Sequence, residues 1–310
     1  MDVLSLVSRE TPAVVFVNPS AGGGRAQTYL PRIKNLFSAC QFHAEFVFTP
    51  SAEELESRTR AAIAAGRRVL LAIGGDGTLQ GLVNAAYGSD AVLGILPAGG
   101  GNDFAAALGL PKNPLSAAHA ILDGRARAVD VLRARTADGQ ERLYVGGGGV
   151  GLDAEAASYA IAYRRVPGRL RYVTAALRAL SAYTPLNVRA EFPGSESPAM
   201  EARVLLAAVL KTPTYGAGIR LAPSAQIDDG VLTTILVRDL SALQVLGLLP
   251  QLVTCGTLPE SHLQRVSAKR VRLTPDHPCL FHGDGEIFGP APVEIEVLPR
   301  AIHILAPAPR

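Results

Sequence analysis

Three glycine-rich segments constrain the fold of this chain more than any other feature of its sequence. Each follows a short apolar run that is typical of a buried strand, and each precedes a stretch with helical periodicity. This alternation predicts an α/β domain, a parallel sheet with helices on both faces. The predicted strands are 13–18, 45–48, 69–73 and 92–96, and the predicted helices are 27–39, 53–65, 79–87 and 102–108.

The glycine loops at residues 18–25, 73–78 and 96–104 predict a phosphate-binding site. The C-terminal ends of parallel strands meet at one edge of a sheet, where ligands of such folds bind. Adjacent glycines let backbone N–H groups approach an anion, and a helix N-terminus adds partial positive charge. Asp76 would need a cation beside phosphate, so its loop also predicts Mg²⁺. Arg25 could bind a phosphate through two hydrogen bonds.

A tight turn is the alternative interpretation of each glycine loop, since Asp-Gly pairs are common in turns. The loop at 73–78 has neither the Walker A pattern nor the dinucleotide fingerprint. Three such loops at successive strand ends favour a ligand site over three unrelated turns. Asp229 and Asp284 also precede glycines, and each could occupy a hairpin tip instead of a functional position.

Near residue 130 the alternation of strands and helices ends, and the predicted strands become closely spaced. Turn pairs such as Asp138-Gly139 and Pro193-Gly194 separate them. This pattern predicts an antiparallel, sandwich-like second domain, so we place the first domain at 1–130 and the second at 131–300. The second set of predicted strands is 129–134, 142–145, 188–192, 203–209, 231–237, 270–273, 292–297 and 301–305.

Two helical segments interrupt the predicted sandwich. One covers residues 159–182, and the other lies in the uncharged stretch 240–259. Leucines and valines of this stretch recur at helical spacing, but serine, glutamine and threonine are interspersed among them. We therefore expect an amphipathic helix that breaks near Pro250, and not a transmembrane span.

The composition excludes several classes of protein. Hydrophobic residues make up 48% of the chain and charged residues 18%, which excludes intrinsic disorder. The formal net charge of +3 excludes a strongly basic protein that coats nucleic acid, so we expect no nucleic-acid partner. Three widely spaced cysteines favour a reducing cytoplasm, and the N-terminal residues lack the pattern of a signal peptide.

The order of motifs resembles the diacylglycerol kinase catalytic family, the bacterial lipid kinases related to sphingosine and ceramide kinases. The motifs are NPSAGGG, GGDGT, LPAGGGNDFA, GGGGVGLDAE and FHGDGE, and the resemblance covers nearly the whole chain. It implies a nucleotide-binding α/β domain like that of NAD kinase and phosphofructokinase, followed by a β-sandwich. It also implies that a last strand near 301–308 returns to the first domain.

The resemblance implies an ATP-dependent lipid kinase that acts on diacylglycerol or a related lipid, with Mg²⁺. Asp284 would be the general base, and Glu286 would support it. Asp76 would hold the catalytic Mg²⁺ together with Asp103. A structural Mg²⁺ would bind the Asp229 side chain and main-chain oxygens of Gln226 and Val231. The residues implied for ATP are Asn18, Ser20, Gly22, Arg25, Gly74, Gly75, Gly77, Thr78, Gly99, Gly100, Asn102 and Asp103.

The chain departs from the family pattern at a few positions. Gly100 stands where the family usually has threonine, Gln80-Gly81 where it has Asn-Glu, and Gly146 where asparagine is common. Two other functions therefore stay open: an NAD kinase-like small-molecule kinase, and a catalytically weak nucleotide-binding regulator.

The expected partners are ATP and a lipid at a membrane surface. Residues 156–190 contain six arginines and no acidic residue, with tyrosines interleaved. Such a segment suits peripheral contact with an anionic membrane, although a solvated helix that covers the sandwich would have the same composition. A homodimer is left open.

Overall fold

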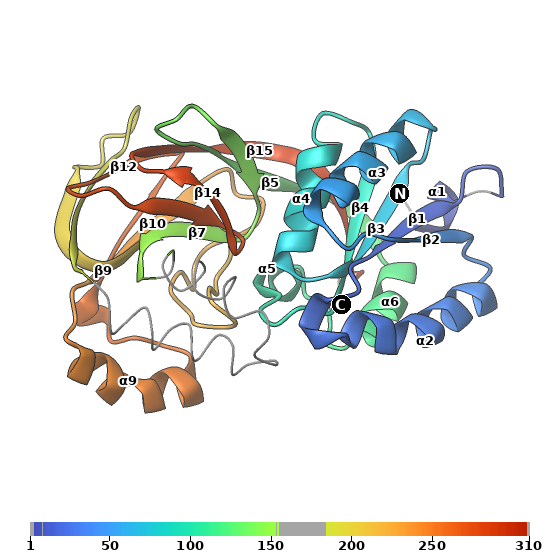
Figure 1. Cartoon of the computed structure of the whole chain (residues 1–310), viewed down its shortest axis with the longest axis horizontal. Helices are drawn as coiled ribbons and strands as arrows, with labels where there is room; N and C mark the ends of the chain where they lie inside the picture. Colours follow the sequence, from blue (N-terminus) through green and yellow to red (C-terminus); the bar gives the residue numbers. More distant parts are fainter. Residues whose placement is uncertain (1–2, 8, 153, 155–183, 309–310) are drawn as a thin grey trace. The chain divides into compact units, whose positions relative to one another are not determined.

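The computed structural model describes residues 3–7, 9–152, 154 and 184–308 of the chain (Figure 1). The chain forms two compact units: Met1–Asp130 with Arg300–Arg310, and Val131–Pro299. The predicted helical segment 159–182 lies outside the described residues, and so does most of the arginine-bearing segment 156–190.

The first unit is built on a parallel sheet of β2 (Ala44–Phe48), β1 (Ala13–Val17), β3 (Val69–Gly74) and β4 (Val92–Pro97), in this order. Every residue of β1, β3 and β4 is buried. Both faces of the sheet are covered, which explains why these strands read as continuous apolar runs. β15 (Val293–Ala306), the last strand of the chain, joins the sheet beside β4, where His303 and Ile304 pair in parallel with Val92 and Leu93.

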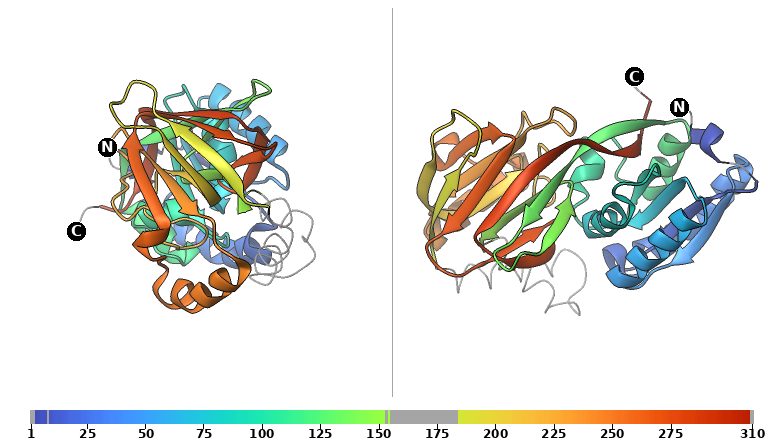
Figure 2. Two further views of the ribbon diagram at one scale, coloured as in Figure 1. Left: turned by 90° about the vertical axis from the view of Figure 1, so that its left-hand side faces the viewer. Right: turned by 90° about the horizontal axis from the view of Figure 1, so that it is seen from above.

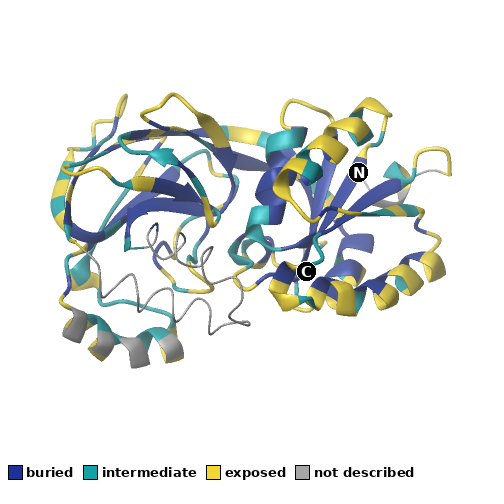
Figure 3. Ribbon diagram, in the orientation of Figure 1, coloured by how far each residue is buried: buried dark blue, intermediate teal, exposed yellow. Residues whose placement is uncertain are grey.

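Helices cover both faces of this sheet, which confirms the predicted α/β class. α2 (Arg25–Ala39) and α6 (Pro114–Leu122) pack together on one face, and α3 (Ala52–Ala64) and α4 (Asp76–Ala86) pack together on the other (Figure 1). Residues on the outer sides of α2, α3 and α6 are exposed, whereas α4 has no exposed residue and β1, β3 and β4 are buried (Figure 3). The short elements of this unit are α1 (Val3–Leu6), α5 (Asp103–Ala107) and the 3₁₀ turn η1 (Ala21–Gly23).

Side-chain caps begin two of these helices. The Ser51 hydroxyl accepts a hydrogen bond of 3.2 Å from the Glu54 N–H at the start of α3. The Asn113 side chain accepts one of 2.9 Å from the Leu115 N–H at the start of α6. Such caps satisfy backbone donors that have no partner within the helix, and Pro114 at the first helical position needs none.

The second unit is an antiparallel β structure, as predicted (Figure 2). β9 is its central strand, because residues 206–210 of β9 pair with β7 and also with β10, while 200–204 pair with β8. The strands are β5 (Arg125–Arg135), which starts in the first unit, β6 (Glu141–Tyr144), β7 (Gly147–Gly151), β8 (Leu186–Glu191), β9 (Met200–Leu210), β10 (Leu232–Arg238), β11 (Leu263–Ala268), β12 (Arg270–Pro275), β13 (Leu280–Gly283) and β14 (Glu286–Pro290).

Three aromatic side chains lie in the core of this unit. Tyr144, Phe281 and Phe288 pack edge to face, with ring centroids 5.7–6.0 Å apart. All three are buried within one hydrophobic cluster to which every strand from β5 to β15 contributes. This core fixes β13 and β14, and therefore the tight turn at Asp284 and Gly285 that joins them.

The predicted break at Pro250 is wrong. α9 (Ala242–Cys255) is one helix that continues through residue 250. Ser241 and Gln244 form a capping box at its start, and Gly256 ends it in the left-handed conformation, with φ 65°. These caps stabilise the helix at both ends and offset the hydrogen bond that a proline removes. Among the described helices, none combines the length and the apolarity that a membrane crossing requires.

Two strand predictions also need correction. The segments 292–297 and 301–305 form one strand, β15. Within it, Arg300 has a left-handed φ of 50°, and its N–H donates to the Asp130 carboxylate at 2.9 Å. The glycine run at 147–151, which is absent from the predicted strands, is the fully buried strand β7. A short 3₁₀ turn, η2 (Glu260–His262), precedes β11.

Candidate active site

The first glycine loop begins where β1 ends and is tied to the second loop by one asparagine. The Asn18 amide donates to the Thr78 hydroxyl at 3.2 Å. The Asn18 side-chain oxygen accepts from the backbone N–H and hydroxyl of Ser20, at 3.1 and 2.9 Å. Asn18, Ser20 and Thr78, which are predicted to line the ATP phosphates, therefore form one hydrogen-bonded group. Arg25 lies exposed at the first position of α2.

Close backbone contacts bring all three loops together. The Gly74 carbonyl accepts from the backbone N–H groups of Ala98 and Gly99, at 2.7 and 3.1 Å. A Cβ atom on Gly99 would lie 2.5 Å from the Gly75 Cα. A Cβ atom on Gly22 would lie 2.0 Å from the Ala98 carbonyl oxygen, at a φ of +59° that also favours glycine. Only residues without a side chain allow this approach.

Asp76 connects the second loop with the third. Its carboxylate accepts hydrogen bonds from the backbone N–H groups of Asn102 at 2.7 Å and Phe104 at 3.4 Å. Asn102 has a left-handed backbone (φ 64°), and its side chain bonds the N–H and the carbonyl of Gly99 at 3.1 and 2.8 Å. A carboxylate therefore lies at the N-terminus of α4, within a frame of glycine-loop backbone.

The electrostatics of Asp76 suit a cation. Burial first, and then the neighbouring carboxylate of Asp103, raise the pKa of Asp76 to about 6. A divalent cation between two carboxylates would relieve this repulsion, so the pair fits the Mg²⁺ that a nucleotide phosphate requires. Among the described residues, no group of three or more histidine, cysteine, aspartate or glutamate side chains is placed to hold a metal by itself.

In the second unit, Asp284 is held by backbone donors. Its carboxylate accepts from the N–H groups of Val145 at 2.8 Å, Gly146 at 2.9 Å and Gly147 at 3.1 Å. The Asp284 N–H donates to the Gly147 carbonyl at 2.8 Å. Asp284 has a φ of 49°, so it lies in the left-handed region at the turn between β13 and β14. Glu286, at the start of β14, is exposed.

The residues that hold Asp284 were not predicted as site residues. Gly146 is a departure from the family pattern, and a Cβ atom added there would lie 2.8 Å from an Asp284 carboxylate oxygen. The buried His282, two residues before Asp284, shares a hydrogen bond of 2.7 Å with the Tyr215 hydroxyl. Glycine at 146–149 was the available signal, because consecutive glycines mark a close backbone approach.

The predicted structural-metal ligands lie in the loop before β10. The carboxylate of Asp229 and the carbonyl of Val231 both face the ammonium group of Lys211, which forms an ion pair with the first and donates to the second at 2.5 Å. Gln226 is exposed. A lysine therefore holds two of the three ligands predicted for a metal.

Among the departures from the family in the first unit, Gly81 has a structural account. Gly81 is buried within α4, and a Cβ there would lie 3.0 Å from the Leu55 side chain, so glycine lets α4 approach α3. Gln80 is buried beside it. Gly100 is exposed in the third loop, and nothing in the fold explains it.

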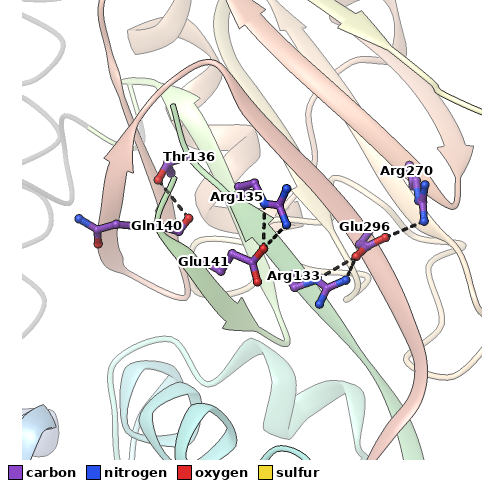
Figure 4. A network of polar contacts seen from close by, with 7 residues as sticks. All are labelled: Arg133, Arg135, Thr136, Gln140, Glu141, Arg270 and Glu296. Atoms are coloured by element: carbon purple, nitrogen blue, oxygen red, sulfur yellow. Dashed lines mark hydrogen bonds and ion pairs between the residues drawn. The ribbon is translucent and has the colours of Figure 1, made fainter. Parts of the chain in front are cut away.

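A separate hollow of about 370 Å³ in the second unit contains none of the predicted site residues. Arginine and glutamate side chains line it, and they pair with one another (Figure 4). Glu296 accepts from Arg133 at 2.8 Å and pairs with Arg270 at 3.0 Å, and these arginines hold the pKa of Glu296 below its usual range. Because each of its four arginines is paired with a glutamate, this hollow is not a candidate anion site.

Comparison with known proteins finds two family models that match successive parts of the chain. The diacylglycerol kinase catalytic domain matches residues 12–134, and the YegS C-terminal NAD kinase beta sandwich-like domain matches residues 147–306. A solved structure described as a diacylglycerol kinase from Bacillus anthracis superimposes with a TM-score of 0.70 at 20% identity, covering 96% of this chain and 98% of that one.

Curated relatives carry kinase names. A "Diacylglycerol kinase" of Mycobacterium tuberculosis is 32% identical over 80% of this chain and 79% of its own length. A "Diacylglycerol kinase" of Bacillus subtilis is 25% identical over 95% of this chain and 96% of its own length. A "Probable lipid kinase YegS-like" protein of Chromohalobacter salexigens is 31% identical over 80% of this chain and 79% of its own length.

The two matched domain models define a kinase whose second unit has the NAD kinase beta sandwich-like architecture. Within that class, the chain belongs to the family of diacylglycerol kinases and YegS-like lipid kinases, and it is a lipid kinase.

Proposed function

We propose that this lipid kinase transfers the γ-phosphate of ATP to a hydroxyl group of diacylglycerol or a related lipid. The observation that carries the proposal is the position of Asp76, whose carboxylate at the N-terminus of α4 binds backbone of the third glycine loop. Phosphoryl transfer depends on positioned phosphates and on neutralised charge, and this arrangement can supply both. The names of the relatives support a diacylglycerol-type acceptor.

The first unit would bind the nucleotide. Backbone N–H groups at the start of α4 and in the glycine loops would donate to phosphate oxygens, together with the Asn18 and Ser20 side chains. Asp76 and Asp103 would hold Mg²⁺, which supplies positive charge against the phosphates. The remaining residues proposed for this half are Gly22, Arg25, Gly74, Gly75, Gly77, Thr78, Gly99, Gly100 and Asn102.

The second unit would supply the base. The oxygen of the lipid hydroxyl forms a bond to the γ-phosphorus while the bond from that phosphorus to the bridging oxygen breaks, so ADP leaves. The hydroxyl proton passes to the Asp284 carboxylate. Three backbone N–H groups fix the orientation of this carboxylate within the second unit. Glu286, which is exposed two residues further along the chain, would support Asp284 in this role.

The lipid substrate implies contact with a membrane surface. We propose a peripheral association in which the arginines of residues 156–190 meet anionic headgroups. Binding to vesicles with and without phosphatidylserine would test this, because electrostatic binding should weaken as salt is raised.

The test is transfer of labelled γ-phosphate from ATP to a panel of lipids in mixed micelles, with NAD as a further acceptor. We expect labelled phosphatidic acid from diacylglycerol, little label on NAD, and almost no product from Asp76→Asn. Asp123→Asn, an exposed aspartate of the same unit, is the matched control. Labelling of NAD alone would favour the small-molecule kinase, and ATP binding without lipid-stimulated turnover would favour the regulator.

A further inference from the structure

Lys211 is a fully buried lysine in a protein unit where most charges lie at the surface. It follows β9 directly, and none of its side chain is exposed. A buried ammonium group is costly unless it is paired and hydrogen-bonded. Both conditions are met here, because Lys211 pairs with Asp229 and donates to the Val231 carbonyl at 2.5 Å.

The Asp229 carboxylate closes the loop around this ammonium group. One of its oxygens, the one paired with Lys211, also accepts from the Val231 N–H at 3.2 Å. The Asp229 side chain is 29% exposed, so solvent reaches the carboxylate of the pair but not the ammonium group. The loop thus presents a carboxylate oxygen and a carbonyl oxygen to a single positive charge.

The same two oxygens are the ones expected to bind a structural Mg²⁺. A magnesium ion lies about 2.1 Å from each oxygen ligand and needs near-octahedral coordination. An ion bound to these atoms would lie within about 5 Å of the ammonium nitrogen, since both would contact the same oxygens. Two such positive charges repel each other, so the donor set around Asp229 does not fit a divalent ion while Lys211 is present.

We propose that the Lys211 ammonium group is the built-in cation of this loop, and that it replaces a structural divalent ion. Lysine is suited to this because its ammonium is a compact point charge with three donors. The replacement also connects the loop to the candidate base. The Lys211 backbone N–H donates to the Gly146 carbonyl at 2.8 Å, and the Gly146 N–H holds Asp284.

The first test compares the wild-type protein with Asp229→Asn in thermal unfolding, without nucleotide or lipid. Each is measured in EDTA and in millimolar Mg²⁺ or Ca²⁺. Any ion bound elsewhere, as at Asp76, shifts both proteins equally. We expect the ion-induced shift in Tm to be the same for the two. A larger shift for the wild type would show an ion at Asp229 and overturn the proposal.

The second test removes the ammonium group. Lys211→Ala leaves the Asp229 carboxylate unpaired beside an opened space, so we expect Tm in EDTA to fall by about 10 °C. We also expect Mg²⁺ or Ca²⁺ to recover several degrees by binding the vacated oxygens, and Lys211→Ala/Asp229→Asn to show no such recovery. Lys269→Ala, an exposed lysine of the same unit, is the control and should respond as the wild type does.

Failure of Lys211→Ala to recover would mean that the loop is no cation site, which would also overturn the proposal. If that variant does not fold, the wild-type comparison still decides. Neither measurement uses enzymatic activity, so the result does not depend on which lipid is phosphorylated.

Discussion

At the scale of single residues, Asp76 should make the stability of the protein depend on pH. Its pKa is raised to about 6, whereas an aspartate in an unfolded chain titrates near 3.9. Between these values the folded state binds a proton that the unfolded state releases. The contribution of Asp76 to stability is therefore fully present below pH 4 and is lost as pH rises through 6.

Chemical denaturation of wild type and Asp76→Asn across pH 4 to 7, without divalent ions, measures this contribution. The free energy of unfolding of the wild type, relative to the variant, should fall by about 2 kcal/mol over this range. The free energy of unfolding of Asp123→Asn should change with pH as that of the wild type does. If Asp76→Asn does so as well, the carboxylate is not perturbed in the folded state.

Asp284→Asn should lower the rate of phosphoryl transfer about 10²- to 10⁴-fold and change the dissociation constant for ATP little. Asparagine keeps the size of the side chain but cannot accept the hydroxyl proton. Steady-state rates on the preferred lipid, with ATP affinity measured separately, would show the split. Glu286→Gln is the comparison and should lose less activity, because Glu286 is exposed. A collapse of ATP binding in Asp284→Asn would instead assign Asp284 to phosphate or metal binding.

At the scale of elements, the segment that leads into β7 is shaped around Asp284. A methyl group on Gly146 would lie 2.8 Å from the carboxylate oxygen and would displace it by a few tenths of an ångström or more. We expect Gly146→Ala to lower the transfer rate about ten- to a hundredfold while ATP affinity stays unchanged. Gly247→Ala, at an exposed position of α9 with open space around it, is the control. Normal rates in Gly146→Ala would show that the position of Asp284 is not critical.

Elements with a strong apolar period could be predicted from the sequence, and elements made of glycine could not. The strands β1, β3 and β4 were found because both of their faces are buried and their residues are uniformly apolar. β7 was missed because its glycines show no alternation, although backbone packing buries them all. α6 was missed although Asn113 and Pro114 form a start signal that the sequence contains. For the site, the glycine loops were visible locally, but the hydrogen bonds of Asp284 to residues some 138 positions earlier were not.

At the scale of the whole molecule, the end of the chain stabilises its beginning. Ile304 is fully buried where β15 pairs with β4 in the first unit. We expect Ile304→Ala to lower the free energy of unfolding by about 3 kcal/mol through the cavity it leaves. Its exposed neighbour His303→Ala should change stability by less than about 0.5 kcal/mol. Equal effects in denaturant titrations would mean that β15 is not packed as described.

The return of β15 also sets an order of events during synthesis. Residues 13–97 contain the first four strands, but the neighbour of β4, residues 293–306, is synthesised much later. Until then the β4 edge carries unpaired backbone groups, which invite wrong pairing and proteolysis. We expect nascent chains stalled before residue 300 to be cleaved within the first unit more readily than released chains, as limited proteolysis would show. Equal resistance would mean that the first unit closes without β15. A chain that lacks residues 293–306 thus lacks the strand that completes the sheet of the first unit.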